Sequence, residues 1–116
     1  MELSKKDKRA AREIFEKSVQ REFANGLNEA NAVIQKWKNN HLGNREAYHL
    51  LFKKITDFDK HIARRYDGMS GSRYFITIAN LFAEEIITEE NTKDFSEEVI
   101  EELYCIKNFR NSTSSE

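Results

Sequence analysis

The residues that come closest to forming a binding site lie between positions 66 and 73. This segment reads Tyr-Asp-Gly-Met-Ser-Gly-Ser-Arg and leads into a predicted helix. Backbone N–H groups at the start of a helix, together with the positive end of the helix dipole, attract phosphates and carboxylates. Neighbouring arginines would add positive charge. We therefore predict an anion site composed of Arg64, Arg65, Gly68, Ser70, Gly71, Ser72 and Arg73.

A structural interpretation of the same segment is favoured over the anion site. The segment matches neither the P-loop pattern nor the G-x-S-x-G nucleophile elbow. Gly68 can end one helix and Ser72 can start the next, because glycine and serine are typical of helix ends. On this interpretation the segment only turns the chain.

Two basic clusters could contact nucleic-acid phosphates, one near the N-terminus and one within residues 44–67. Acidic residues are interleaved with both clusters, and the formal net charge of the chain is only −1. A solvated face of mixed charge is therefore favoured over a nucleic-acid interface. The clusters comprise Lys5, Lys6, Lys8, Arg9 and Arg12, and then Lys53, Lys54, Lys60, Arg64 and Arg65.

Two pairs of residues have spacings found in metal sites. Glu46 and His49 form a Glu-x-x-His motif, as in di-iron helical bundles, and Asp57 and His61 are four residues apart. A di-iron bundle needs a second Glu-x-x-His motif, which the sequence lacks. On a helical wheel all four side chains lie about 120–180° from the centre of the local apolar stripe. We therefore expect them to face water or a partner, and we predict neither a metal nor a cofactor.

No set of residues in the chain has the composition of a catalytic site. The glutamates between positions 97 and 102 form the wet face of a predicted helix, without a nucleophile or a histidine beside them. They could form an acidic docking surface for a basic partner. The sequence thus predicts no catalytic residue.

Four helical segments must position these residues, and no segment has a convincing strand pattern. The first spans residues 3–40, with Ser4 as its N-cap and a solvated extension over its first ten residues. Gly26 lies within its apolar stripe, which predicts one unbroken helix with a neighbouring helix close to the glycine. The stripe comprises Phe15, Val19, Phe23, Ala30, Val33, Ile34 and Trp37.

The second segment spans residues 44–67 and follows a turn over residues 40–43. We expect Gly43 to end the first helix, Asn44 to cap the second, and Gly68 to adopt a left-handed conformation after it. One face of this segment is apolar, and both stripes are expected to be core. Its members are Tyr48, Leu51, Phe52, Ile55, Phe58, Ile62 and Tyr66.

The third segment, residues 72–88, is apolar around most of its circumference. Such a helix is either central in a bundle or part of an oligomer interface. A polar connector over residues 88–95 leads to the fourth segment, residues 96–109, with Asp94 or Ser96 as its cap. Residues 111–116 are expected to form a frayed polar tail.

Composition agrees with an all-α, four-helix, bundle-like single domain over residues 1–110. The 116 residues include no proline and four glycines, so interior helix breakers are scarce. Cys105 is the single cysteine and no signal peptide is recognisable, which predicts a cytoplasmic protein without a membrane span. Residues 1–67 carry 15 basic and 10 acidic residues, whereas residues 68–116 carry 4 and 10.

This asymmetry, the absence of a catalytic set and the apolar third segment together favour a non-enzymatic interaction or adaptor protein that could form a homodimer. Its partner would be a protein of unidentified nature. Two alternatives stay open: a nucleic-acid-associated regulator that uses the basic clusters, and a binder of a phosphate- or carboxylate-bearing ligand at residues 68–73.

Overall fold

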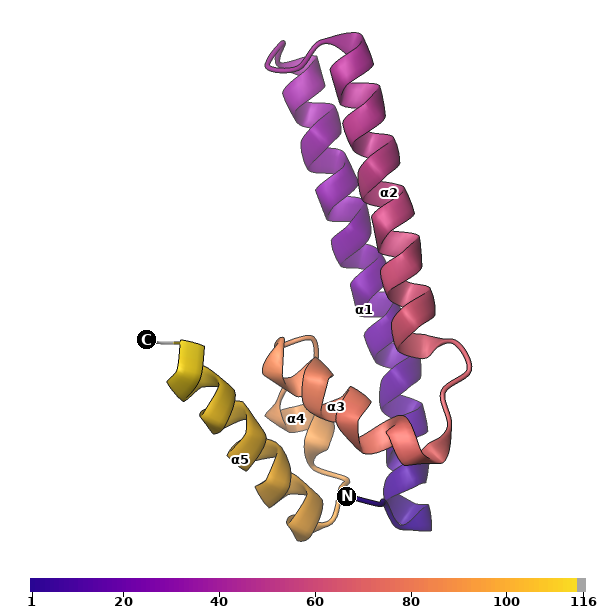
Figure 1. Ribbon diagram of the computed structural model, residues 1–116, viewed down its shortest axis with the longest axis vertical. Helices are drawn as coiled ribbons and strands as arrows, with labels where there is room; N and C mark the ends of the chain where they lie inside the picture. The colour runs from indigo at the N-terminus through magenta and orange to yellow at the C-terminus, as the bar shows by residue number, and fades with distance from the viewer. Residues whose placement is uncertain (115–116) are drawn as a thin grey trace. The chain divides into compact units, whose positions relative to one another are not determined.

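Ser4 caps the first helix, as the sequence predicts. The Asp7 N–H donates to Ser4 Oγ at 3.1 Å, and α1 (Lys5–Lys38) continues through Gly26 without a break. The computed structural model describes residues 1–114, which are all-α and contain no strand (Figure 1). The predicted all-α class and the long first helix are confirmed.

A Schellman motif ends α1. Asn40 adopts a left-handed φ of 62°, its N–H donates to the Trp37 carbonyl, and the His41 N–H donates to the Lys36 carbonyl at 2.8 Å. The prediction that Gly43 ends this helix was wrong. Gly43 has a φ of −72° and precedes α2 (Asn44–Tyr66), so Asn44 is the first residue of α2 rather than its cap. Asparagine can take the left-handed role because its short polar side chain tolerates that conformation.

Contacts within the chain divide it into two compact units. The core unit comprises residues 1–18 and the chain from residue 68 onward, and the hairpin unit comprises residues 19–67. α1 contributes its first turns to the core unit and its remainder to the hairpin unit.

After the left-handed Gly68 (φ 62°), the core unit continues through a 3₁₀ turn, η1 (Gly71–Arg73), into α3 (Tyr74–Ala83). The predicted third segment extended to residue 88, but α3 ends five residues earlier. A second Schellman motif ends it: Glu85 has a φ of 62°, and the Ile86 N–H donates to the Leu81 carbonyl. The short α4 (Glu89–Thr92) lies in the predicted connector and is followed by α5 (Glu97–Ser114).

α3 packs against α5 in the core of this unit. The Phe82 ring meets the Tyr104 ring edge-to-face at 5.3 Å, and both Phe82 and Leu103 are almost fully buried. Most of α3 is covered by its own chain, which makes it central in this unit, whereas Ile76 is 46% exposed. A role of this segment in an oligomer interface stays a prediction. The buried apolar residues of the core are Leu3, Ala11, Ile14, Phe75, Ile78, Ala79, Leu81, Phe82, Ile87, Phe95, Val99 and Leu103.

Both ends of the chain depart from expectation. The first ten residues are not a solvated extension, because Leu3 is buried in the core and Asp7 is 3% exposed. Asp7 accepts hydrogen bonds from the Ser96 N–H and hydroxyl, both at 2.9 Å, and so holds the start of α5. α5 continues to Ser114, through most of the segment expected as a frayed tail. Residues 115 and 116 of that predicted tail lie outside the described part of the chain.

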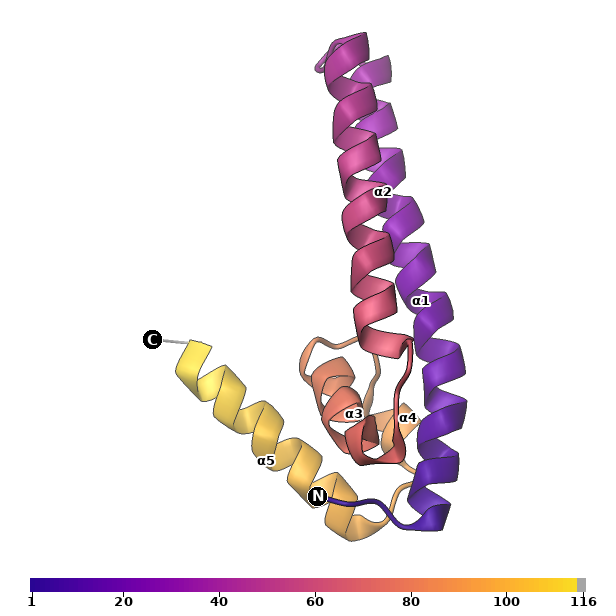
Figure 2. The same cartoon turned by 45° about the vertical axis from the view of Figure 1, so that its right-hand side comes forward.

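The hairpin unit is two antiparallel helices, with α2 returning alongside the second part of α1 (Figure 2). Gly26 faces the Phe58 ring so closely that a Cβ atom on it would lie 3.1 Å from the ring. The predicted close approach at this glycine is confirmed. None of the helices described here has the length and apolarity that crossing a membrane would require.

Candidate functional site

A buried carboxylate lies between the two helices of the hairpin unit. Glu22 on α1 is 5% exposed and is bonded by three side chains of α2. Glu22 Oε1 lies 2.7 Å from His61 Nε2 and accepts from Arg65 Nη1 at 2.9 Å, while Oε2 accepts from the Tyr66 hydroxyl at 2.5 Å. These four residues, the Glu22 cluster, join the helices at the end of the hairpin unit away from its turn.

Burial and hydrogen bonding shift the pKa of the Glu22 carboxyl in opposite directions. Burial by itself raises its pKa, because a charged group is disfavoured away from water. The hydrogen bonds from Tyr66 and His61 and the charge of Arg65 outweigh burial, so the pKa of Glu22 lies below its ordinary value of 4.5. Glu22 is therefore ionised near neutral pH and acts as a structural acceptor.

The sequence interpretation missed the Glu22 cluster, although a signal for it exists. Glu22 is seven residues after Phe15, which places it about 20° from the origin of the stripe, among apolar residues. A carboxylate at such a position needs a partner. The prediction that His61 faces water or a partner is confirmed only in part, because its side chain is 36% exposed but its ring contacts Glu22.

The hairpin unit leaves a large apolar surface uncovered. Only Val33 and Ala47 among its hydrophobic side chains are buried. The aromatic stripes predicted to be core are therefore only partly covered. We call the six uncovered side chains the hairpin face: Phe23 (43% exposed), Leu27 (72%), Trp37 (42%), Tyr48 (69%), Phe52 (63%) and Ile55 (49%).

Helical spacing places these side chains together. On α1, Phe23, Leu27 and Trp37 are four and ten residues apart, and on α2, Tyr48, Phe52 and Ile55 are four and three apart. Spacings of three and four keep residues on one side of a helix, and a spacing of ten leaves about 80° between two side chains. The two helices also share grooves along this side, one of about 210 Å³ lined by Phe23, Leu27, Ala30, Ile55 and Phe58 among others. The hairpin face is therefore one continuous surface.

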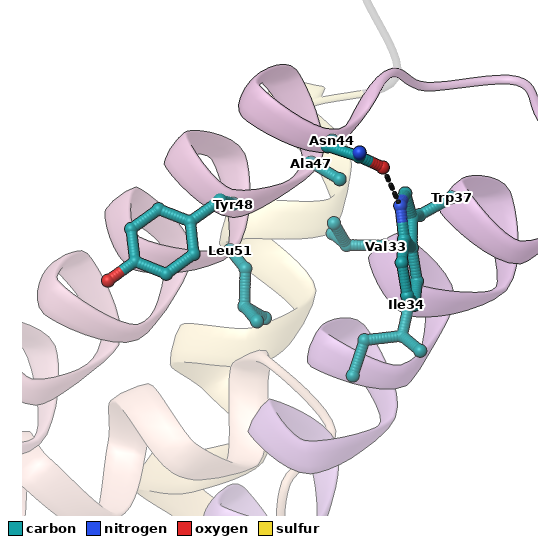
Figure 3. Close-up of a pocket in the computed structure, with 7 residues that line it drawn as sticks. All are labelled: Val33, Ile34, Trp37, Asn44, Ala47, Tyr48 and Leu51. Carbon is teal, nitrogen blue, oxygen red and sulfur yellow. Dashed lines mark hydrogen bonds between the residues drawn. The ribbon is translucent and has the colours of Figure 1, made fainter.

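A second hollow on the hairpin face is a pocket of about 220 Å³ next to the α1–α2 turn (Figure 3). Its end is fixed by a hydrogen bond of 2.7 Å from the Trp37 indole N–H to Asn44 Oδ1. Because the Asn44 side chain already accepts from the indole N–H, the rest of the pocket wall is almost purely apolar. The pocket is lined by Val33, Ile34, Trp37, Asn44, Ala47, Tyr48 and Leu51.

The residues of the predicted anion site have different surroundings. Arg65 is engaged by Glu22 within the hairpin unit, and Arg64 is exposed there. In the core unit, Ser70 Oγ and Ser72 Oγ bond each other at 2.9 Å, and Arg73 is exposed in a turn of 3₁₀ helix. The Lys8 side chain also lies beside this segment, in contact with Gly71. The prediction of an anion site at Gly68 to Arg73 stays a prediction.

The basic clusters are only partly available to a polyanion. Lys5, Lys6, Arg9 and Arg12 are exposed on α1. On α2, Lys53 Nζ pairs with Asp57 at 2.7 Å, and Lys54 lines a groove of the hairpin face. The exposed Lys60 and Arg64 complete the α2 cluster. Nucleic-acid binding likewise stays a prediction.

The candidate metal residues do not converge. Asp57 pairs with Lys53, and the ring of His49 stacks edge-on against Tyr48, a neighbour in sequence. Within residues 1–114, no three histidine, cysteine or acidic side chains gather closely enough to hold a metal ion.

Comparisons with protein families, with curated proteins and with solved structures find no match to this chain. The hairpin face and the Glu22 cluster therefore rest on their own geometry.

Proposed function

We propose that the protein is a non-enzymatic interaction protein whose hairpin face binds the apolar side of a helical protein partner. The single observation that carries this proposal is the size of the uncovered surface. With roughly 200 Å² for each large side chain, the six residues expose about 700 Å² together. The largest apolar patch on a typical monomer is only about 300–600 Å², and larger patches mark interaction sites.

The form of the surface supports a helical partner in particular. Two antiparallel helices with apolar residues at spacings of three and four present a groove along their length, into which a third helix can lay its own apolar side. The pocket beside Trp37 would hold one bulky anchor residue of that partner. Buried anchors in such pockets supply most of the binding energy of protein interfaces.

Substitution of the hairpin face tests the proposal. Phe52→Asp places a charge in the middle of the face and should abolish partner binding in cells, with the partner identified and its binding repeated with purified proteins. Phe109→Asp is the matched control, because Phe109 is 70% exposed on α5 in the core unit. Retention of every partner by Phe52→Asp would contradict the proposal.

A further inference from the structure

We infer that the partner of the hairpin face is a second copy of this chain, and that Leu27 of each copy fills the pocket of the other. The inference rests on the proposed function, since it names the occupant of the same surface. The two copies would be related by a two-fold axis, so their four hairpin helices would pack together through the same face.

The area of the hairpin face suits a pair of identical chains. Its roughly 700 Å² of apolar residues approaches the 800 Å² or so that each partner contributes to a stable interface of standard size. The half-buried Ile34 and Leu51 flank it and add further apolar surface. Homodimer interfaces are also more apolar than transient ones, as this face is.

The charges along the face favour self-association over a strongly charged partner. Asp59 lines the groove between the helices, and Glu29 and Lys54 line both this groove and the neighbouring groove beside His61. Both signs are therefore present on one surface, and a two-fold axis can bring the lysine of one copy toward a carboxylate of the other. A strongly acidic or strongly basic partner would instead require charged residues of a single, opposite sign around the hairpin face.

The position of the most protruding residue fixes a register for the pair. Ala30 lies near the middle of the α1 part of the face, with Leu27 three residues before it and Ile34 four residues after it. A two-fold axis midway between the levels of Ala30 and Asn31 brings Leu27 of one copy to the level of Ile34 in the other. Ile34 lines the pocket beside Trp37, so Leu27, which is 72% exposed, meets an apolar hollow of the other copy.

Sedimentation of the full chain and of two variants measures the association. The parent chain at about 100 µM should sediment with twice its mass of 13.7 kDa. Leu27→Asp should raise the dissociation constant at least about 100-fold, because the substitution removes an anchor twice in each dimer. Leu27 is exposed, so the variant should keep the helical signal of the parent. Phe109→Asp, at matched exposure, should remain dimeric.

A cross-linking measurement separates failure of this inference from failure of the proposed function. Benzoylphenylalanine at position 27 should cross-link to residues of the pocket in a second copy, both in purified protein and in cells. A monomeric parent that cross-links instead to a different identified protein would overturn the second copy as occupant and leave the docking function standing. A monomer with no protein cross-link, or a dimer that Leu27→Asp does not weaken, would overturn the inference. The monomer with no cross-link would also count against the docking function.

Discussion

Glu22→Gln tests whether the buried carboxylate is what joins the two helices of the hairpin unit. Glutamine keeps the shape of the side chain and one acceptor oxygen but removes the charge that faces His61, Arg65 and Tyr66. Hydrogen bonds to charged groups contribute about 1.5–3 kcal/mol each, against about 0.5–1.5 kcal/mol for neutral ones. We therefore expect the free energy of unfolding to fall by about 2–3 kcal/mol at pH 7.

This loss corresponds to a large shift in melting temperature. Unfolding entropy of about 2.1 cal/mol/K per residue amounts to roughly 0.24 kcal/mol/K for a chain of this length, so the midpoint should fall by about 8–12 °C. Far-ultraviolet circular dichroism during heating and in urea measures both quantities. Glu16→Gln is the control, because Glu16 is exposed on α1 and should change stability by less than about 0.5 kcal/mol.

The same variant predicts a pH dependence of definite sign. The pKa of Glu22 is lowered in the folded protein, so its ionised form stabilises the fold above the ordinary value of 4.5. That contribution is lost as the pH falls through the folded-state pKa. The difference between parent and Glu22→Gln should be full at pH 7 and should shrink between pH 4.5 and more acidic values. An equal difference at pH 7 and pH 3, or no difference at pH 7, would refute the reasoning.

Three further substitutions test the packing of both units by urea unfolding. Gly26→Val should destabilise by about 1–3 kcal/mol, because even a Cβ would lie 3.1 Å from the Phe58 ring; unchanged stability would mean that the helices separate freely. Asp7→Ala should cost about 1–3 kcal/mol and speed amide exchange at Ser96, whereas unaltered exchange would contradict its role at α5. Leu103→Ala should cost about 2–5 kcal/mol, and a loss below 1 kcal/mol would dispute its place in the core.

Local signals in the sequence predicted the elements well and their ends less well. Ser4 and Gly68 act as expected, since a serine cap and a left-handed glycine depend on neighbouring residues alone. The end of α3 was missed because apolar residues continue past Ala83. Glu85 takes the left-handed conformation there, and a glutamate gives no sign of that in sequence. The conformation costs about 1–2 kcal/mol and is held by the bonds of the Schellman motif and by burial of Ile87.

The residues of the candidate site were harder to predict from the sequence than the helices were. Apolar stripes on α1 and α2 were identified, but every residue in them was expected to be core. Two helices facing each other cover only part of a stripe about 100° wide, so Phe52 and Phe23 remain exposed. The Glu22 cluster was hidden for a related reason. Glu22 is about 40 residues before the other three members in the chain, and they come together only when the helices pair.

The amino-acid pattern alone is enough to establish that this protein is helical, with one long first helix and a glycine that admits a close neighbour. Periodicity, caps and the absence of proline act over a few residues, so they can be deduced without knowing the fold. Which side of each stripe is covered depends on how the helices pack. Gly26 against Phe58 and Glu22 against His61 set the rotation of the two helices about their axes. That rotation leaves the hairpin face open, because a helix can bury only the side that its neighbour reaches.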